Sequence, residues 1–120
     1  CVETVISGPS LERWHREQTG RSMKFREIAS LEGSDPGARD TVDRLCEFFG
    51  RSLAQVVNVL DPNAVILGGG VGQTPALLTR GRDALRRNVF NLRLDTELLT
   101  PELGDSAGVF GAAMLTAGGV

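Results

Sequence analysis

The stretch Asp61-Pro-Asn-Ala-Val-Ile-Leu-Gly-Gly-Gly-Val71 decides the fold of this chain. A long apolar helical pattern runs up to Asp61 and must stop there, because Pro62 cannot continue a helix. The four apolar residues 64–67 lie between a proline and a glycine, which is typical of a buried parallel strand. Three glycines follow, and a backbone without Cβ atoms can take positive φ and let another group approach closely.

This glycine run would lie at the carboxyl end of the strand, the edge at which α/β sheets bind ligands. A helix is predicted to begin at Thr74-Pro75, since this pair suits an N-cap and a first helical position. Strand end, glycine loop and helix start would then meet, as in many nucleotide sites. A tight turn without a ligand explains the same residues, and the pattern matches neither GxGxxG nor the GxxxxGK[ST] loop.

The amino-acid composition limits the classes of protein to which this chain can belong. The 120 residues suffice for one modest domain or half of a larger one, and 41% hydrophobic residues indicate a globular chain. The net charge of −2 and the absence of a long charge run argue against nucleic-acid binding by this segment. No apolar run has the length of a membrane span, and Cys1 and Cys46 make no disulfide framework. A cytoplasmic protein without membrane contact is expected, with Cys46 as a reduced core residue.

The remainder of the chain is predicted to be mostly helical. Helical patterns cover residues 9–20, 25–31, 35–60, 75–89 and 107–115. Asp35 and Pro36 begin the longest helix, and its apolar residues at spacings of three and four define a core-facing stripe. Residues 98–101 form a second short strand. Two strands make an incomplete sheet, so the chain is expected to be a fragment of a larger fold.

Two groups of polar side chains allow both a functional and a structural interpretation. His15, the only histidine, stands among charged residues on a helix, which favours a solvated side chain over a catalytic one. The arginines at positions 80, 82, 86 and 87 share the polar side of their helix. They could bind phosphate, but a solvated helix face is favoured.

Three stretches together resemble the ROK family (repressors, open reading frames and sugar kinases). Residues 1–9, CVETVISGP, are similar to the end of the family's CxCGxxGCxExxxSG signature, and look closest to bacterial fructokinases. Residues 61–71 are similar to its DPxxIVLGGGV motif. Residues 103–113, LGDSAGVFGAA, are similar to its closing LGDxAGxxGAA motif. Order and spacing agree, so the resemblance covers the whole chain.

The resemblance implies a fold of the actin/hexokinase/RNase H type, with two α/β domains and a cleft between them. Residues 1–120 would be the C-terminal half, helix-rich with few strands. It also implies ATP-dependent phosphorylation of a hexose, most specifically fructose to fructose 6-phosphate, with Mg²⁺ at the phosphates. The family's catalytic aspartate, first phosphate loop and ExGH sugar motif have no match here. The chain is therefore expected to hold no catalytic residue and to be inactive by itself.

The resemblance also assigns binding residues. Glu3 matches a glutamate that accepts hydrogen bonds from sugar hydroxyls, with a surface or helix-capping role as the alternative. Cys1 matches the last of three cysteines that hold a structural zinc together with a histidine, although one cysteine cannot close a tetrahedral site. The positions that line the adenosine and phosphates of ATP are matched by Pro9, Gly68, Gly69, Gly70 and Val71.

Other functions fit the same resemblance. Family repressors share this half and add an N-terminal helix-turn-helix, so a sugar-responsive repressor is the alternative. Such repressors often lose a clean glycine loop, and the complete loop here favours a kinase. A truncated product that serves only as a dimerising module is the third possibility. Family members commonly dimerise through their C-terminal domains, and helix 35–60 is apolar beyond a narrow stripe, so a homodimer is expected.

Overall fold

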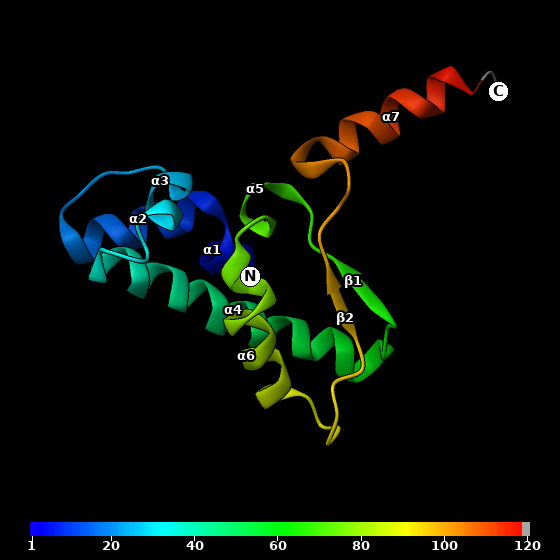
Figure 1. The fold of residues 1–120 in the computed structure, drawn as a ribbon, viewed down its shortest axis with the longest axis horizontal. Helices are drawn as coiled ribbons and strands as arrows, with labels where there is room; N and C mark the ends of the chain where they lie inside the picture. Colours follow the sequence, from blue (N-terminus) through cyan, green and yellow to red (C-terminus); the bar gives the residue numbers. More distant parts are fainter. Residues whose placement is uncertain (119–120) are drawn as a thin grey trace.

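The computed structural model describes residues 1–118, and one long helix, α4 (Pro36–Leu60), is the element on which most others pack. In Figure 1, helices α2 and α3 lie along its first half, α6 crosses it, and the two strands lie beside its second half. The other elements are α1 (Glu3–Ile6), α2 (Gly8–Thr19), α3 (Phe25–Ser30), β1 (Ala64–Ile66), α5 (Gly69–Gly72), the 3₁₀ helix η1 (Pro75–Leu78), α6 (Arg80–Asn88), β2 (Glu97–Leu99), the 3₁₀ helix η2 (Gly104–Ser106) and α7 (Ala107–Ala117). No helix within residues 1–118 is long and apolar enough to cross a membrane.

Local sequence sets the ends of α4, as predicted. The Asp35 carboxylate accepts a hydrogen bond from the Ala38 N–H at 3.0 Å, and Pro36 occupies the first turn. The helix ends at Asp61, whose φ of 45° is left-handed, and Pro62 follows immediately. The predicted helices 9–20 and 25–31 are also confirmed as α2 and α3.

The apolar stripe of α4 is covered by other helices of the same chain. Leu11 of α2, Phe25 of α3 and Leu77 of η1 are buried against Val42 and Leu45. A second cluster, farther along α4, contains Ala54, Val57, Leu85 and Leu98. The stripe is thus core-facing, as predicted, whereas Val56, on another side of α4, stays 44% exposed.

Helices α4 and α6 touch backbone to backbone at Gly50. A Cβ atom at this position would lie 2.4 Å from the Cβ of Ala84 and 2.5 Å from the Leu85 nitrogen. No larger residue fits without separating the two helices. This contact fixes α6 against α4, and with it the start of the segment that leads to β2.

The two strands pair in parallel, as predicted, with Val65 opposite Leu98. The pairing continues at the carboxyl end, where the Leu67 N–H donates to the Leu99 carbonyl at 2.7 Å. The prediction that β1 is buried is wrong, because Ala64 is exposed and Ile66 is 65% exposed. Only Val65 packs onto the helices, since within residues 1–118 the sheet has two strands and helices on one face.

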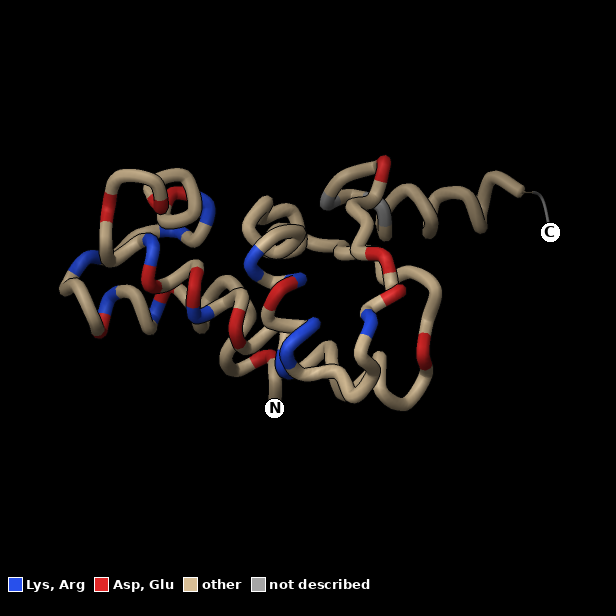
Figure 2. The backbone as a smooth tube through the Cα atoms, turned by 60° about the horizontal axis from the view of Figure 1, so that its bottom comes forward, with Lys and Arg blue, Asp and Glu red and all other residues tan. Residues whose placement is uncertain are grey.

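Helix α7 leads away from the other elements (Figure 1). It has no charged residue along its length, as the tan tube in Figure 2 shows, and Met114 and Leu115 are 71% and 80% exposed. The radius of gyration is 15.9 Å, whereas a compact domain of this length would have about 14 Å. A helix that is apolar all round is normally buried, so α7 presents a surface suited to protein contact.

Candidate functional site

The glycine run lies where the sequence predicted it, at the carboxyl end of β1. Gly68, Gly69 and Gly70 are all exposed, and Gly69 has a φ of +78°, which residues with side chains rarely adopt. A Cβ on Gly72 would lie 2.8 Å from the carbonyl oxygen of Leu67, so α5 packs directly on the strand end. The GGG pattern pointed to the loop, but the close approach at Gly72 appears only in the structure.

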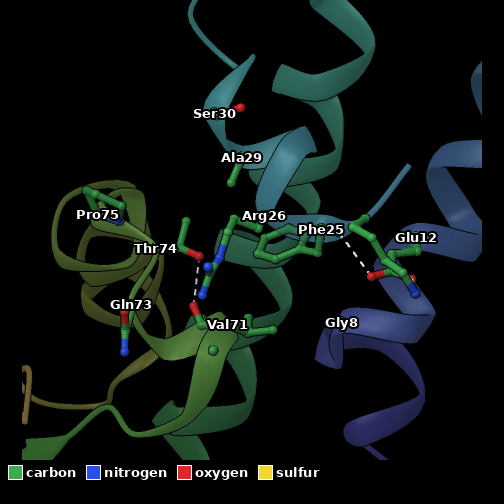
Figure 3. Close-up of a pocket in the computed structure, with 12 residues that line it drawn as sticks. Gly8, Glu12, Phe25, Arg26, Ala29, Ser30, Val71, Gln73, Thr74 and Pro75 are labelled. Carbon is green, nitrogen blue, oxygen red and sulfur yellow. Dashed lines mark hydrogen bonds and ion pairs between the residues drawn. The ribbon is translucent and has the colours of Figure 1, made fainter. Parts of the chain in front are cut away.

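A pocket of about 540 Å³ separates this loop from helices α2 and α3 (Figure 3). Gly70, Val71 and Pro75 form one wall, and Phe25 and Ala29 form the other. The volume falls within the range of small-molecule sites, which are lined mainly by apolar groups.

Gly8, at the start of α2, completes this lining: a Cβ there would lie 3.8 Å from Cγ2 of Val71. The sequence pattern pointed to the neighbouring Pro9, which instead borders a separate shallow concavity near Glu12. The structure therefore brings Gly70 and Val71 together with Gly8, and leaves Pro9 one residue from the pocket wall.

Two polar side chains beside the pocket have partners within the protein. One oxygen of Glu12 accepts a hydrogen bond from the Phe25 N–H at 3.0 Å, and the other lies 3.5 Å from Nζ of Lys24. The Thr74 hydroxyl donates to the Val71 carbonyl at 2.7 Å, so it closes the loop instead of capping a helix. These bonds hold the walls of the pocket, and their polar groups are already satisfied.

The segment after the loop differs from the predicted single helix 75–89. A 3₁₀ turn, η1, ends at Leu78, and Thr79 separates it from α6 with φ and ψ of −111° and −85°. The turn lets η1 cover the first core cluster while α6 follows α4 over the second. Tertiary packing therefore overrides the continuous helical pattern.

The arginines of α6 are only in part the solvated group that was expected. Arg80 binds the carboxylates of Glu32 and Asp43, the latter at 2.7 Å, and Arg87 binds Glu47 at 2.9 Å. Glu32 follows α3, and η1 precedes Arg80, so the ion pairs join the two segments that carry the pocket walls. Arg82 and Arg86 are exposed as expected.

The expectation for His15 is wrong. Its side chain is fully buried between α2 and α4, with Nδ1 2.9 Å from the Thr41 hydroxyl oxygen. That hydroxyl also contacts the Gly37 carbonyl at 2.9 Å, so the buried imidazole is tied to the backbone of α4 through Thr41. Nε2 is buried without a partner in the described residues. The charged neighbours in sequence point outward, while His15 lies on the face that α4 covers.

Cys46 is the core residue that the sequence predicted. It is 3% exposed, its Sγ donates weakly to the Ala76 carbonyl at 3.5 Å, and burial raises the pKa of its thiol to about 11. A thiol that stays protonated at neutral pH is a poor nucleophile. Cys46 therefore has a structural role.

Glu3 and Cys1 lie away from the pocket, at the exposed start of the chain. Glu3 begins α1, and its backbone carbonyl accepts a bond from the Ser7 N–H, while its carboxylate is exposed. Cys1 is exposed and free. Nowhere in residues 1–118 do three His, Cys, Asp or Glu side chains gather as a metal site. Cys1 could therefore supply one ligand at most.

Comparison with known proteins gives the family. The model of the ROK family matches residues 1–118. The chain belongs to the ROK family. Over 116 residues it is 29% identical to the N-acetylgalactosamine kinase AgaK of Shewanella, and 30% identical to an N-acetyl-D-glucosamine kinase of Mannheimia succiniciproducens. Each match covers 96% of this chain but only 38% of the relative, so the chain spans well under half the length of these proteins.

Solved structures agree with this assignment. A ROK family glucokinase from Streptomyces griseus, in complex with glucose and AMPPNP, matches with a TM-score of 0.82 and 29% identity over 96% of this chain and 44% of its own. The ROK hexokinase of Thermus thermophilus matches with a TM-score of 0.79 and 32% identity over 95% of this chain and 39% of its own. The expected fold is confirmed: the chain is a helix-rich part of the actin-like ATPase fold.

Proposed function

We propose that this chain is part of an ATP-dependent sugar kinase that phosphorylates a hexose. The observation that carries the proposal is the exposed glycine loop, with Gly69 at positive φ, beside a mainly apolar pocket of about 540 Å³. A bare backbone suits close approach of phosphates, and such a pocket suits a nucleoside. The relatives described above, which are kinases of N-acetylhexosamines, support the same activity.

The residues of this chain would bind and orient the two substrates. The backbone at Gly68, Gly69 and Gly70 would receive the phosphates of ATP, and Val71 and the pocket would hold the adenosine. Pro9 would support this wall from its place beside Gly8. ATP would supply the phosphoryl group and Mg²⁺ would neutralise its charge. No residue of this chain is proposed as a ligand of Mg²⁺.

Glu3 is the proposed sugar contact. Its exposed carboxylate is free to accept hydrogen bonds from sugar hydroxyls, and charged hydrogen bonds of this kind are strong. The base that removes the proton of the attacking hydroxyl would be an aspartate outside these residues. Fructose is the hexose that we propose, on the resemblance of residues 1–9 to fructokinases.

The side chains present do not by themselves fit a structural zinc ion. Cys1 is a single thiol, and four ligands are needed. Cys1 remains a proposed ligand only in combination with residues outside this chain. Metal analysis of the full-length protein, with Cys1→Ser as the comparison, tests this proposal.

A sugar-responsive repressor is the alternative function. A ROK family transcriptional regulator has a similar structure, with a TM-score of 0.70, but at 21% identity this likeness concerns the fold alone. The complete glycine loop favours the kinase. A helix-turn-helix in the sequence upstream of residue 1, together with binding to operator DNA, would favour the repressor.

The direct test is an assay of the full-length protein that contains this chain. ATP consumption would be measured with fructose, glucose, N-acetylglucosamine and N-acetylgalactosamine, and the 120-residue chain would be assayed in parallel. We expect turnover by the full-length protein, fastest with fructose, and none by the chain alone. A different preferred hexose would overturn the fructose proposal only. No turnover with any of these sugars would overturn the kinase.

A further inference from the structure

Two cationic side chains, Lys24 and Arg26, line the pocket. They differ in whether another side chain of the protein forms an ion pair with them. Lys24 is held by Glu12, at 3.5 Å. Arg26 is exposed and has no hydrogen-bond or ion-pair partner within residues 1–118. In Figure 3 its side chain extends from α3 across the pocket, toward the wall that carries Val71 and Thr74.

Arg26 is the unpaired arginine that lines this pocket, and the unpaired arginines elsewhere in residues 1–118 are Arg13, Arg16, Arg82 and Arg86. Other arginines are held by carboxylates. Arg21 binds Asp35 at 2.6 Å, Arg80 binds Asp43 at 2.7 Å, and Arg87 binds Glu47. Arg26 has no carboxylate to hold it, although it stands over a pocket. Its guanidinium is therefore available to a ligand.

The surroundings of Arg26 favour a flat apolar ligand over an anion. Phe25 and Ala29, which flank it on the same wall, bring no free donor, because the Phe25 N–H already donates to Glu12. The Ser30 hydroxyl donates to the Glu27 carbonyl, and Lys24, although 81% exposed, is paired with Glu12. An anion would require further donors, whereas an aromatic ring requires only a planar surface above it. Guanidinium groups stack on aromatic rings through cation–π and planar contact.

We propose that Arg26 stacks on the nucleobase of the bound nucleotide and so acts as a specificity-determining residue of the pocket. The proposal rests on the proposed function, in which the glycine loop receives the phosphates and the pocket receives the nucleoside. Arg26 would be the group that holds the base. Because stacking grows with ring area, nucleotides with purine bases are expected to bind better than those with pyrimidine bases.

The test compares adenosine with ATP in the full-length protein. Calorimetry would measure the binding of both to the unchanged protein and to Arg26→Gln, which removes charge and planar cation together. We expect about tenfold weaker binding of adenosine and of ATP alike, because the lost contact is to the base. The control is Arg82→Gln, an exposed arginine of α6 away from the pocket, which should bind both ligands normally.

Each outcome decides between the two proposals. A loss for ATP with unchanged adenosine binding would mean a phosphate contact, and would overturn the inference. Unchanged binding of both ligands by Arg26→Gln would also overturn it, while the nucleotide site would stand. If the unchanged protein bound neither ligand, the proposed function at this pocket would fail as well. Should Arg26→Gln not fold by circular dichroism, Arg26→Met, which keeps the apolar stem, replaces it with the same criteria.

Discussion

Glu3 is the residue on which the proposed sugar contact depends. We expect Glu3→Ala in the full-length protein to lower kcat/KM for the sugar about ten- to a hundredfold, because a charged hydrogen bond contributes about 1.5–3 kcal/mol. The KM for ATP should stay unchanged. Steady-state kinetics with each substrate varied in turn would measure both, and Glu17→Ala, an exposed glutamate of α2, is the control. Normal sugar kinetics in Glu3→Ala would refute the assignment.

Gly69 is the glycine whose backbone conformation matters most in the loop. Its φ of +78° is strained for any residue with a Cβ and most of all for a β-branched one. We expect Gly69→Val to weaken ATP binding at least tenfold while the fold persists. Gly33→Val is the matched control, because the space around Gly33 is open, its φ is not positive and it does not line the pocket. Calorimetry with circular dichroism would report both, and normal binding by Gly69→Val would mean that the loop is only a turn.

At this scale the sequence predicts only what is encoded locally. Three consecutive glycines after an apolar run indicate a loop with special backbone angles, and the structure has one. Gly72 and Gly8 carry no such local signal, since their importance comes from Leu67 and Val71. The burial of His15 has no local signal either, because its environment is set by α4, which lies in another part of the sequence.

Among the elements, α4 has a start that depends on the ionisation of its N-cap. Hydrogen bonding to Arg21 and to the Ala38 N–H holds the pKa of Asp35 well below its usual range. Since the pKa is lowered on folding, the contribution to stability is present above the unfolded value, about 3.9. It is lost as the pH falls below that value toward the folded pKa.

Asp35→Asn tests this pH dependence, because asparagine keeps a cap acceptor but cannot ionise. We expect the variant to be less stable than the unchanged chain at pH 7, and the difference to shrink as the pH falls to 3. Urea unfolding at several pH values would measure it. Asp40→Asn, an exposed residue of the same helix, should show little difference at any pH. A constant difference for Asp35→Asn would show that its charge does not matter.

Helix ends were predictable at this scale because their signals are adjacent in sequence: Asp35 with Pro36, and Gly20 with its φ of 74°. The break at Thr79 was not predictable, because it results from the packing of η1 and α6 on different parts of α4. The exposure of β1 was not predictable either. A run of apolar residues indicates a strand that would be stable when buried. Whether the strand is buried depends on other elements, which the run itself does not reveal.

Within residues 1–118, apolar side chains remain exposed on several elements, and also on the segment after α6, where Phe90 and Leu92 are 90% and 104% exposed. Leu60 ends α4 with 70% exposure, Ile66 lies on the open sheet face, and Leu115 stands on α7. Large apolar patches are rarely left in water. The expected homodimer therefore remains a prediction, but its contact surface moves from the middle of α4 to these positions.

We expect the 120-residue chain to self-associate, and replacement of Phe110 and Met114 by serine to weaken the association at least tenfold. Both side chains are exposed on α7, so the double variant should leave the cores intact. Sedimentation equilibrium over a range of concentrations would measure the dissociation constant. A well-folded species near 12.8 kDa at high micromolar concentration, without binding of a hydrophobic dye, would refute the prediction.

The parallel pairing of β1 with β2 has a consequence for the order in which the chain folds. Parallel strands cannot be joined by a hairpin, so Val65 meets Leu98 only after the whole segment from α5 to α6 has been placed. Helix α6, in contrast, can dock on α4 as soon as both exist. Hydrogen exchange should therefore show the Leu67 amide opening more often than the amides of α4 around Val42. Equal protection would contradict this order. The glycine loop follows Leu67 directly, so the nucleotide would bind to the segment that forms last, and binding would complete the folding of its own site.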